Sequence, residues 1–286
     1  MAKRIFLFLL TNIAVVTTIS LILSVLGIRP GDGLLPLAIF CLIWGMGGAF
    51  ISLQISRWMA KRAMGVQLVD GNTGNADVDW LYRAVERLTQ AAQLPMPEVG
   101  IYDSPEVNAF ATGPSKNRSL VAVSTGILRA MRRNELEAVL GHEVTHIANG
   151  DMVTMTLLQG VMNAFVMFAA RIIASLVTSS SRDERGSSGL YFLVRFACEI
   201  VLGILGSMIT AWFSRHREFR ADAGGASLAG SENMVAALQR LAEGTQAVDP
   251  RAPALASFKI SGAPKFMALF STHPPLDVRI HALRHH

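Results

Sequence analysis

The chain has 286 residues, of which 51% are hydrophobic and only 16% charged. This apolar excess is too large for an ordinary soluble domain of this length, so a membrane protein is expected. The formal net charge is +5, but no basic stripe with interleaved aromatic residues occurs, which argues against nucleic acid as a partner. The two cysteines, Cys41 and Cys198, lie inside predicted membrane spans, which argues against a disulfide framework and a thiolate metal site.

Two apolar stretches open the chain. Ile5 to Ile28 contains no ionisable side chain, and it is long enough to cross a bilayer core of about 30 Å. Leu34 to Ser56 repeats the pattern. Lys3 and Arg4 precede the first stretch as in a signal peptide, but the apolar run is too long and no small-residue cleavage site follows it. Residues 1–56 therefore predict two retained transmembrane helices.

Residues 57–151 are more polar and predict the first part of a cytoplasmic catalytic domain. Apolar residues at helical spacing predict a helix from Asp77 to Gln93. Short strands are predicted at Val66–Asp70, Glu98–Tyr102, Val107–Ala111 and Ser119–Val123. Gly113 to Asn117 predicts the turn of a hairpin between the last two strands.

The segment from Asn108 to Thr112 has two interpretations. In the first, it is an exposed edge strand on which Asn108, Ala109 and Phe110 align a polypeptide substrate by β-augmentation. In the second, it is an ordinary paired strand within the sheet. Phe110 would accordingly line either a side-chain pocket or the core.

The most informative motif is the pentad from His142 to His146, in which Glu143 lies beside the first of two histidines four positions apart. On a helix both imidazoles share one face and can reach a single ion, as in a catalytic zinc site. Asn134, with a glutamate three residues later, predicts the N-cap of this helix, and Asn149-Gly150 predicts its end. A zinc hydrolase is therefore predicted.

Residues 152–214 predict a transmembrane hairpin made of Met152–Ser181 and Leu190–Ser214. Charged side chains interrupt both stretches. Arg195 and Glu199 stand four residues apart on one helix face and predict an ion pair that offsets part of the burial penalty. The pair serves either to pack the helices or to contact a substrate or proton.

Residues 215–286 predict the second part of the catalytic domain. Helices are predicted from Ser214 to Leu228 and from Glu232 to Glu243, followed by a loop from Gln246 to Pro264 that is rich in Ala, Pro and Ser. The basic residues that flank the spans are Lys3, Arg4, Arg57, Lys61, Arg62, Arg215, Arg217 and Arg220. By the positive-inside rule they place both termini and both catalytic parts in the cytoplasm, facing the anionic lipids of the bilayer.

A catalytic zinc ion usually takes three protein ligands and leaves one position for water, so His142 and His146 need a partner. The candidates are His216, Glu218, His273, His281, His285 and His286. The segment 215–222 is favoured because the hairpin returns the chain to the membrane face that it left. Glu218 could bind zinc while Asp222, one turn later, accepts the outer N–H of a ligand imidazole. Alternatively, both carboxylates form salt bridges with neighbouring arginines.

Several of these segments together resemble the membrane-integrated zinc metalloproteases of the HtpX type, which are related to the CAAX prenyl endopeptidases. The segments that carry the resemblance are Asn108–Gly113, Gly141–His146, Asn149–Asp151, Arg217–Asp222 and Thr272–Pro275 with Arg279. The resemblance implies that Glu218 is the third ligand, that Asp222 supports a ligand from behind, and that the core is of the gluzincin type. The expected fold is an α+β zincin-like catalytic domain, a small sheet plus helices, integrated with four transmembrane helices.

The resemblance also implies a bacterial inner-membrane endopeptidase. Its substrates would be damaged or misfolded membrane proteins, as part of protein quality control and the stress response. The resemblance further implies an ATP-dependent membrane protease as a possible partner in the same pathway. The chain itself shows no nucleotide-binding loop, because Gly71 to Asn75 lacks the ending of a P-loop.

The expected mechanism uses one zinc ion per chain and Glu143 as the general base that takes a proton from water. His273 precedes two prolines that could hold it rigidly, so it either stabilises the oxyanion or caps a backbone carbonyl. Two other functions remain open. They are a non-catalytic membrane scaffold stabilised by zinc and a prenyl-protein endopeptidase.

Overall fold

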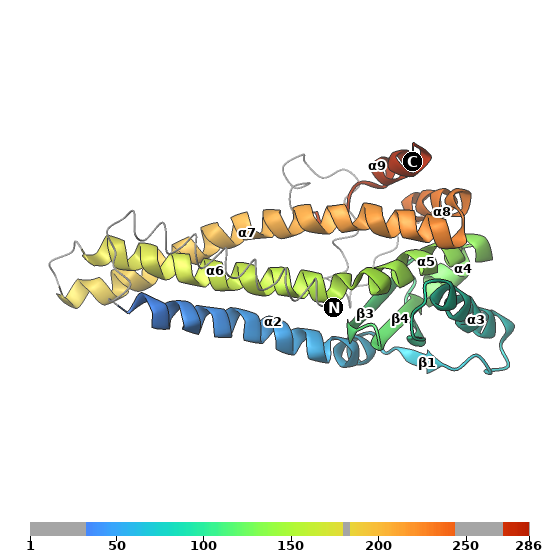
Figure 1. The fold of residues 1–286 in the computed structure, drawn as a ribbon, viewed down its shortest axis with the longest axis horizontal. Coiled ribbons are helices and arrows are strands. Elements are labelled where there is room, and N and C mark those ends of the chain that lie inside the picture. The colour runs from blue at the N-terminus through green and yellow to red at the C-terminus, as the bar shows by residue number, and fades with distance from the viewer. Residues whose placement is uncertain (1–32, 180–183, 244–270, 286) are drawn as a thin grey trace. The chain divides into compact units, whose positions relative to one another are not determined.

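The computed structural model describes most of the chain, namely residues 33–179, 184–243 and 271–285. Figure 1 shows the order of its helices and strands along the chain. The first predicted span, Ile5 to Ile28, and the predicted loop from Gln246 to Pro264 lie outside the described residues.

The chain divides into two compact units, and each unit is built from two separate pieces of sequence. Met1–Ser52 and Thr154–Thr210 form the first, which we call the apolar unit. Leu53–Val153 and Ala211–His286 form the second, which we call the mixed unit because it contains helices and a sheet. The pentad with the two histidines lies in the mixed unit.

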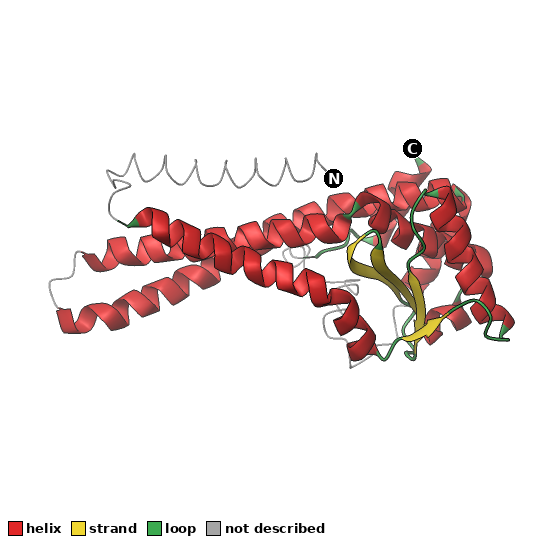
Figure 2. Cartoon of the chain, turned by 60° about the horizontal axis from the view of Figure 1, so that its bottom comes forward, coloured by secondary structure: helices red, strands yellow, loops and turns green. Residues whose placement is uncertain are grey.

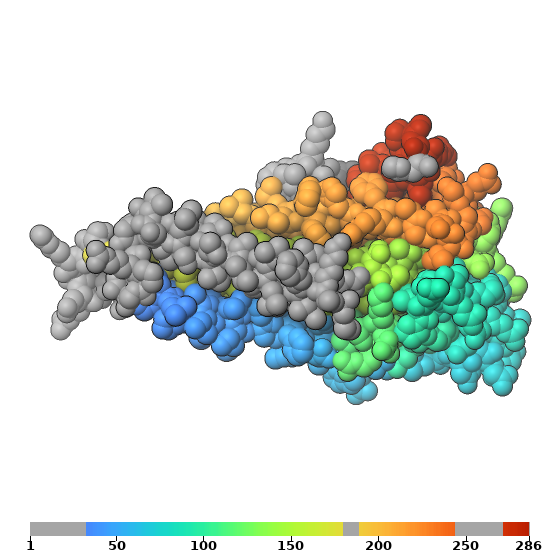
Figure 3. All heavy atoms as spheres, in the orientation of Figure 1, coloured from blue at the N-terminus to red at the C-terminus, as the bar shows by residue number. Residues whose placement is uncertain are grey.

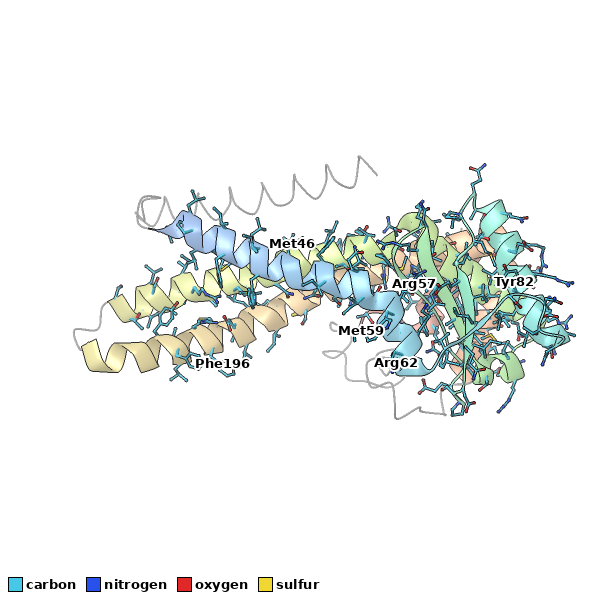
Figure 4. The ribbon with its side chains drawn as sticks, turned by 90° about the horizontal axis from the view of Figure 1, so that it is seen from below. Met46, Arg57, Met59, Arg62, Tyr82 and Phe196 are labelled. Atoms are coloured by element: carbon cyan, nitrogen blue, oxygen red, sulfur yellow. The ribbon has the colours of Figure 1, made fainter. Side chains whose placement is uncertain are left out.

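The apolar unit consists of parts of three long helices, α2 (Leu34–Met64), α6 (Asp151–Ser179) and α7 (Glu184–Ala229). Within the described residues, these three helices have the length and composition needed to cross a membrane. Large apolar side chains cover their outer faces; Phe196, for example, is 55% exposed on the outer side of α7 (Figure 4). Such faces suit lipid rather than water. The second and fourth predicted spans lie within α2 and α7, and α6 contains the third predicted span as far as Ser179.

Small residues allow α2 and α6 to pack closely. A Cβ atom added at Gly45 would lie only 2.6 Å from the backbone nitrogen of Ala164. Close backbone approach at small residues is the usual way in which helices associate in lipid. Near this crossing, Cys41 is buried with Phe168 and Ile172 and forms no disulfide.

Charged side chains of the apolar unit compensate one another. Arg195 Nε donates to Glu199 Oε1 at 2.9 Å, which confirms the predicted ion pair. Arg171 also approaches Glu199, with 3.6 Å between Nη1 and Oε1. The Arg171 guanidinium in addition lies 5.7 Å from the centre of the Phe40 ring. The carboxylate therefore links α7 to α6 through Arg171, and it also pairs with Arg195 on its own helix.

The mixed unit contains a sheet of four strands, drawn in yellow in Figure 2. The strands are β1 (Gln67–Val69), β2 (Glu98–Tyr102), β3 (Ala109–Ser115) and β4 (Arg118–Ser124). Their order is β1-β2-β4-β3. β2 and β4 are parallel, and the two outer pairings are antiparallel. The sheet is small and mixed, and β3 lies at one edge.

The two faces of β4 belong to different apolar clusters, as expected when side chains alternate along a strand. Val121 and Val123 join the main core with helices α3 (Ala76–Ala91), α5 (Arg133–Asn149) and α8 (Ser231–Glu243). Leu120 and Ala122 lie on the other face with Tyr102. Phe110 packs there too, 5.7 Å from the Tyr102 ring between ring centres, so its side chain contributes to this second cluster.

Salt bridges join the end of α2 to the sheet. Arg57 and Lys61 both contact Glu98 at the start of β2, at 3.1 and 3.0 Å. Figure 4 shows Arg57 beside the sheet. Helix α3 contacts β1, and the atoms of these two segments adjoin at the surface of the mixed unit in Figure 3.

The hairpin turn differs from the prediction. β3 continues through Gly113, Pro114 and Ser115, so that only Lys116 and Asn117 remain as the turn. The register shifts between Thr112 and Ser115, and Gly113 has a φ of 140°. A bulge in an edge strand tolerates proline, which has no N–H to donate. Glycine and proline are also typical of turns, so the sequence of this segment predicts a turn where the structure has a bulge.

The start of α5 also differs from the prediction, because Arg132 and not Asn134 is the N-cap. Glu135 accepts a hydrogen bond from the backbone N–H of Arg132 at 2.9 Å, and this reciprocal contact sets the first turn. Two short helices, α4 (Thr125–Ala130) and α9 (Leu276–Arg284), were not predicted. They are too short to show a clear apolar period.

Candidate metal centre

The two predicted imidazoles lie on one face of α5. His142 and His146 are both buried, and their Nε2 atoms are 3.1 Å apart. Glu143, between them in sequence, is half-buried. Three residues after His146 the helix ends at Asn149, and the C-cap Gly150 has a φ of 64°, the left-handed cap expected from Asn149-Gly150.

Helix α7 brings Glu218 to the two histidines. Its side chain is 0% exposed, with Oε2 3.5 Å from His142 Nε2 and Oε1 3.4 Å from His146 Nε2. The three ligand atoms of this group all lie within 4.8 Å of one another. His216, another candidate, is exposed and its Nδ1 bonds to the Trp212 carbonyl at 2.9 Å, so it turns away from the site.

The approach of α7 to α5 depends on two glycines. A Cβ atom at Gly225 would lie 2.9 Å from the backbone nitrogen of His142, and one at Gly224 would overlap the Thr145 side chain. Without these glycines the two helices could not come close enough for Glu218 to reach the imidazoles.

Gly225→Val is therefore expected to push α7 away from α5. The overpacking should lower the free energy of unfolding by about 1–3 kcal/mol and weaken metal binding, both measured on the purified chain in detergent. Gly203→Val on the same helix is the matched control, because a Cβ there meets nothing within 4 Å. Equal behaviour of the two variants would contradict this account of the helix contact.

His142 is held from behind by a carboxylate and an arginine. Its Nδ1 lies 2.9 Å from Asp222 Oδ1, and Arg279 on α9 donates through Nε to Asp222 Oδ2 at 2.7 Å. Burial alone would lower the pKa of His142, but the bonds to Asp222 and Glu218 outweigh it and raise the pKa. The same carboxylate raises the pKa of the buried Arg279. The sequence predicted Asp222 in this place, while the role of Arg279 depends on tertiary packing.

His146 is held in the same way by Asp151, for which the sequence analysis assigned no role. The distance from His146 Nδ1 to Asp151 Oδ2 is 2.8 Å, and Asp151 is buried. Burial lowers the pKa of His146, but hydrogen bonds to Asp151 and Glu218 raise it to about 9. The position of Asp151 directly after the helix-ending Gly150 is the signal that could have suggested this contact.

His273 contacts the carboxylate of Glu218. The distance between His273 Nδ1 and Glu218 Oε2 is 2.8 Å. The structure thus brings His273 to the histidine pair, as the sequence suggested, and gives it a carboxylate partner. Each of His142, His146 and Glu218 therefore has a polar neighbour that fixes its orientation.

The chemistry of the donor set fits a metal ion. Both Nδ1 atoms face carboxylates, so each imidazole, when neutral, donates there and turns the lone pair of its Nε2 toward the other ring. Glu218 Oε1 points to the same place and, among the described residues, is buried without a hydrogen-bond partner. With both rings neutral, three lone-pair donors converge on a position that a cation would satisfy.

The edge strand β3 packs beside α5, so its backbone is close to this centre. The Asn108 carbonyl accepts a hydrogen bond from the Ser124 N–H at 2.9 Å, and every second residue bonds to β4 from there on. The N–H and C=O groups of Ala109 and Ala111 therefore point to the open edge. Beyond that edge the described chain has no further strand.

Comparison with known proteins gives a consistent result. Residues 75–286 match Peptidase family M48. The chain is 50% identical over 286 residues to "Protease HtpX" of Idiomarina loihiensis, covering 98% of each chain. It is 53% identical over 296 residues to "Protease HtpX homolog" of Methylacidiphilum infernorum, covering 99% of this chain and 98% of that one.

The fold is similar to that of Ste24p from S. mikatae, known from a crystal structure. The TM-score is 0.60 at 17% identity, and the match covers 99% of this chain and 67% of that chain. At this identity the likeness concerns the fold alone. Together with the family match and the apolar helices, it leads to one assignment: the chain belongs to peptidase family M48 and is a membrane metallopeptidase.

Proposed function

We propose that this protein is a zinc-dependent, membrane-integrated endopeptidase that cleaves misfolded or damaged membrane proteins. The observation that carries the proposal is the convergence of two imidazole lone pairs and one buried carboxylate oxygen beside Glu143. Nitrogen and oxygen donors of this kind, three in number with one position left open, are typical of catalytic zinc.

In this proposal His142, His146 and Glu218 hold one zinc ion. The chemistry that zinc supplies when bound is Lewis-acid catalysis, which lowers the pKa of water and polarises a carbonyl. Glu143, which directly follows His142 on α5, accepts the proton from the attacking water and then delivers it to the leaving amine. Asp222 keeps His142 in the tautomer that offers Nε2 as a ligand.

His273 has a separate task in the proposal. Its Nδ1 is engaged with Glu218 at 2.8 Å, so Nε2 is the ring atom that would donate to the developing oxyanion. The two prolines that follow limit the backbone movement of this residue. The contact with Glu218 supports this task because it places His273 beside a proposed zinc ligand.

The substrate would bind as an added strand along β3, at the segment of Asn108, Ala109 and Phe110. The outward N–H and C=O groups of Ala109 and Ala111 support this mode, because main-chain bonds give affinity with little sequence preference. Ala111→Pro removes one outward N–H and no bond to β4. We expect kcat/KM to fall about tenfold, the effect of one lost hydrogen bond of about 1.4 kcal/mol, mostly through a higher KM.

Ala111→Ser is the control, because it keeps the N–H with a side chain of similar size. Both variants would be assayed with the same unfolded substrate and compared for thermal stability. Unchanged kcat/KM in a stable Ala111→Pro enzyme would rule out substrate pairing at this position.

We further propose that residues 1–56 and 152–214 supply four transmembrane helices, and that residues 57–151 and 215–286 make up the catalytic domain. Basic residues at the ends of the spans favour an inner bacterial membrane with both termini in the cytoplasm. An ATP-dependent membrane protease would act in the same pathway. Supporting observations are the apolar helices and the relatives named "Protease HtpX".

The experiment that tests the proposal is cleavage of an unfolded membrane protein in detergent by the zinc-loaded chain. Activity should disappear with a zinc chelator and return with added zinc. Lipidated and unlipidated peptides, offered in parallel, would distinguish a prenyl-protein endopeptidase by its requirement for the lipid. Absence of cleavage across several unfolded substrates, in a chain that contains zinc, would favour the scaffold function instead.

A further inference from the structure

At the junction of α5 and α6 the side chains of His146 and Asp151 lie side by side. α5 ends with His146 in its last turn, Gly150 caps it in the left-handed conformation, and α6 starts at once with Asp151. Figure 1 shows α6 continuing directly from α5. No loop separates the two helices, so the first residue of α6 is fixed relative to the last turn of α5.

Asp151 is a buried acidic residue at this junction. It is 3% exposed, and its Oδ2 lies 2.8 Å from His146 Nδ1. Its other oxygen, Oδ1, is 4.0 Å from Arg220 Nη2, and that arginine is 61% exposed. So long a contact with a solvated side chain contributes little. The bond to His146 therefore offsets more of the burial penalty of this carboxylate than the contact with Arg220 does.

The geometry of this bond determines what the imidazole can do. A carboxylate on Nδ1 holds the proton there, so Nε2 keeps its lone pair and faces Glu218 Oε1 at 3.4 Å. The same bond fixes the rotation of the ring and makes Nε2 a stronger electron donor. His142 has an equivalent partner in Asp222, but that carboxylate comes from α7 and is itself held by Arg279.

We propose that Asp151 is a positioning residue for the metal centre, which sets the tautomer and orientation of His146, and that α6 thereby determines the geometry of this ligand. The inference rests on the proposed function in that His146 binds zinc. Asp151 is not one of the three residues whose ligand atoms converge, so it acts through the imidazole. The helix that begins at Asp151 is also one of the three that are long and apolar enough to span a membrane.

The test measures zinc affinity, by competition with a chelator, for the full-length chain in detergent. Asp151→Ala should weaken zinc binding about 10- to 100-fold, the range found when such supporting partners are removed. Asp151→Asn keeps an oxygen of the same reach but not the charge. It should recover the ring orientation, so that the visible spectrum of the cobalt-substituted protein is close to that of the original chain, with an intermediate affinity.

A matched control separates positioning from helix capping. Asp77 is also an acidic residue in the first turn of a helix, α3, but its side chain is 79% exposed and pairs with Arg133 at the surface. Asp77→Ala should leave zinc affinity and the cobalt spectrum unchanged. The thermal unfolding of each metal-free variant shows whether its fold is intact.

Two results would overturn the inference. The first is that Asp151→Ala binds zinc as tightly as the original chain does. The second is that Asp151→Ala and Asp151→Asn lose zinc affinity equally and that this loss parallels a lower unfolding temperature. Failure of the proposed function looks different, because then the original chain would not bind zinc or would bind it without peptide hydrolysis.

Discussion

Glu143→Gln is expected to keep its zinc and to lose about 10²- to 10⁴-fold in the rate of peptide hydrolysis, the usual contribution of a general acid-base. The two side chains have nearly the same shape, but the amide cannot accept a proton from water. Glu143 is half-buried on α5 beside the two histidines and is not one of the three residues whose ligand atoms converge. Metal content should therefore be insensitive to the change.

Cleavage would be measured with an unfolded membrane protein in detergent, after zinc contents have been shown to be equal. Glu137→Gln is the matched control, since Glu137 lies on the same helix and pairs with Arg87 at 2.9 Å, away from the histidines. It should cleave at the normal rate. If Glu143→Gln retained full activity, Glu143 would have no part in proton transfer, or the activity would come from a contaminant.

Glu218→Ala should reduce zinc affinity by more than the about 10- to 100-fold typical of a lost supporting residue, because it removes a direct ligand. It also leaves His273 Nδ1 without its carboxylate, which is 2.8 Å away in the structure. The result should be a chain that loses zinc to chelators under conditions where the original retains it, and that cleaves nothing.

Metal content and chelator competition measure this effect directly. Glu232→Ala on α8 is a suitable control, because it removes an exposed glutamate in a first turn. Unchanged zinc content in Glu218→Ala would assign the third ligand to a different residue. Unfolding of the metal-free variant, followed in parallel, would show whether a loss of zinc reflects the missing ligand or a damaged fold.

The metal centre could be predicted where it depends on local spacing. His142 and His146 share a helix face because of the helical period alone. Placing Glu218 beside them needed a topological argument, since α6 and most of α7 separate it from His146 in sequence. The contact of Arg279 with Asp222 was out of reach, because it depends on how a short helix near the C-terminus docks against the core.

The fold was predictable in its periodic elements and not in its irregular ones. The helix at α3 and the strands at β2 and β4 follow clear apolar periods, and their bounds match within two residues. The bulge at Gly113 was mistaken for a turn, because glycine and proline favour both. The N-cap of α5 was misplaced, because Asn134 has the better intrinsic capping side chain while Glu135 makes the actual backbone contact.

The mixed unit is discontinuous in sequence, and this determines the order in which its parts are synthesised. Synthesis delivers both histidines first, and the ribosome must then produce the whole hairpin before Glu218 and Arg279 emerge. Until the hairpin has folded back, a nascent chain carries two imidazoles without their carboxylate ligand. A chain made in this order can complete the candidate metal centre only after the hairpin has been synthesised.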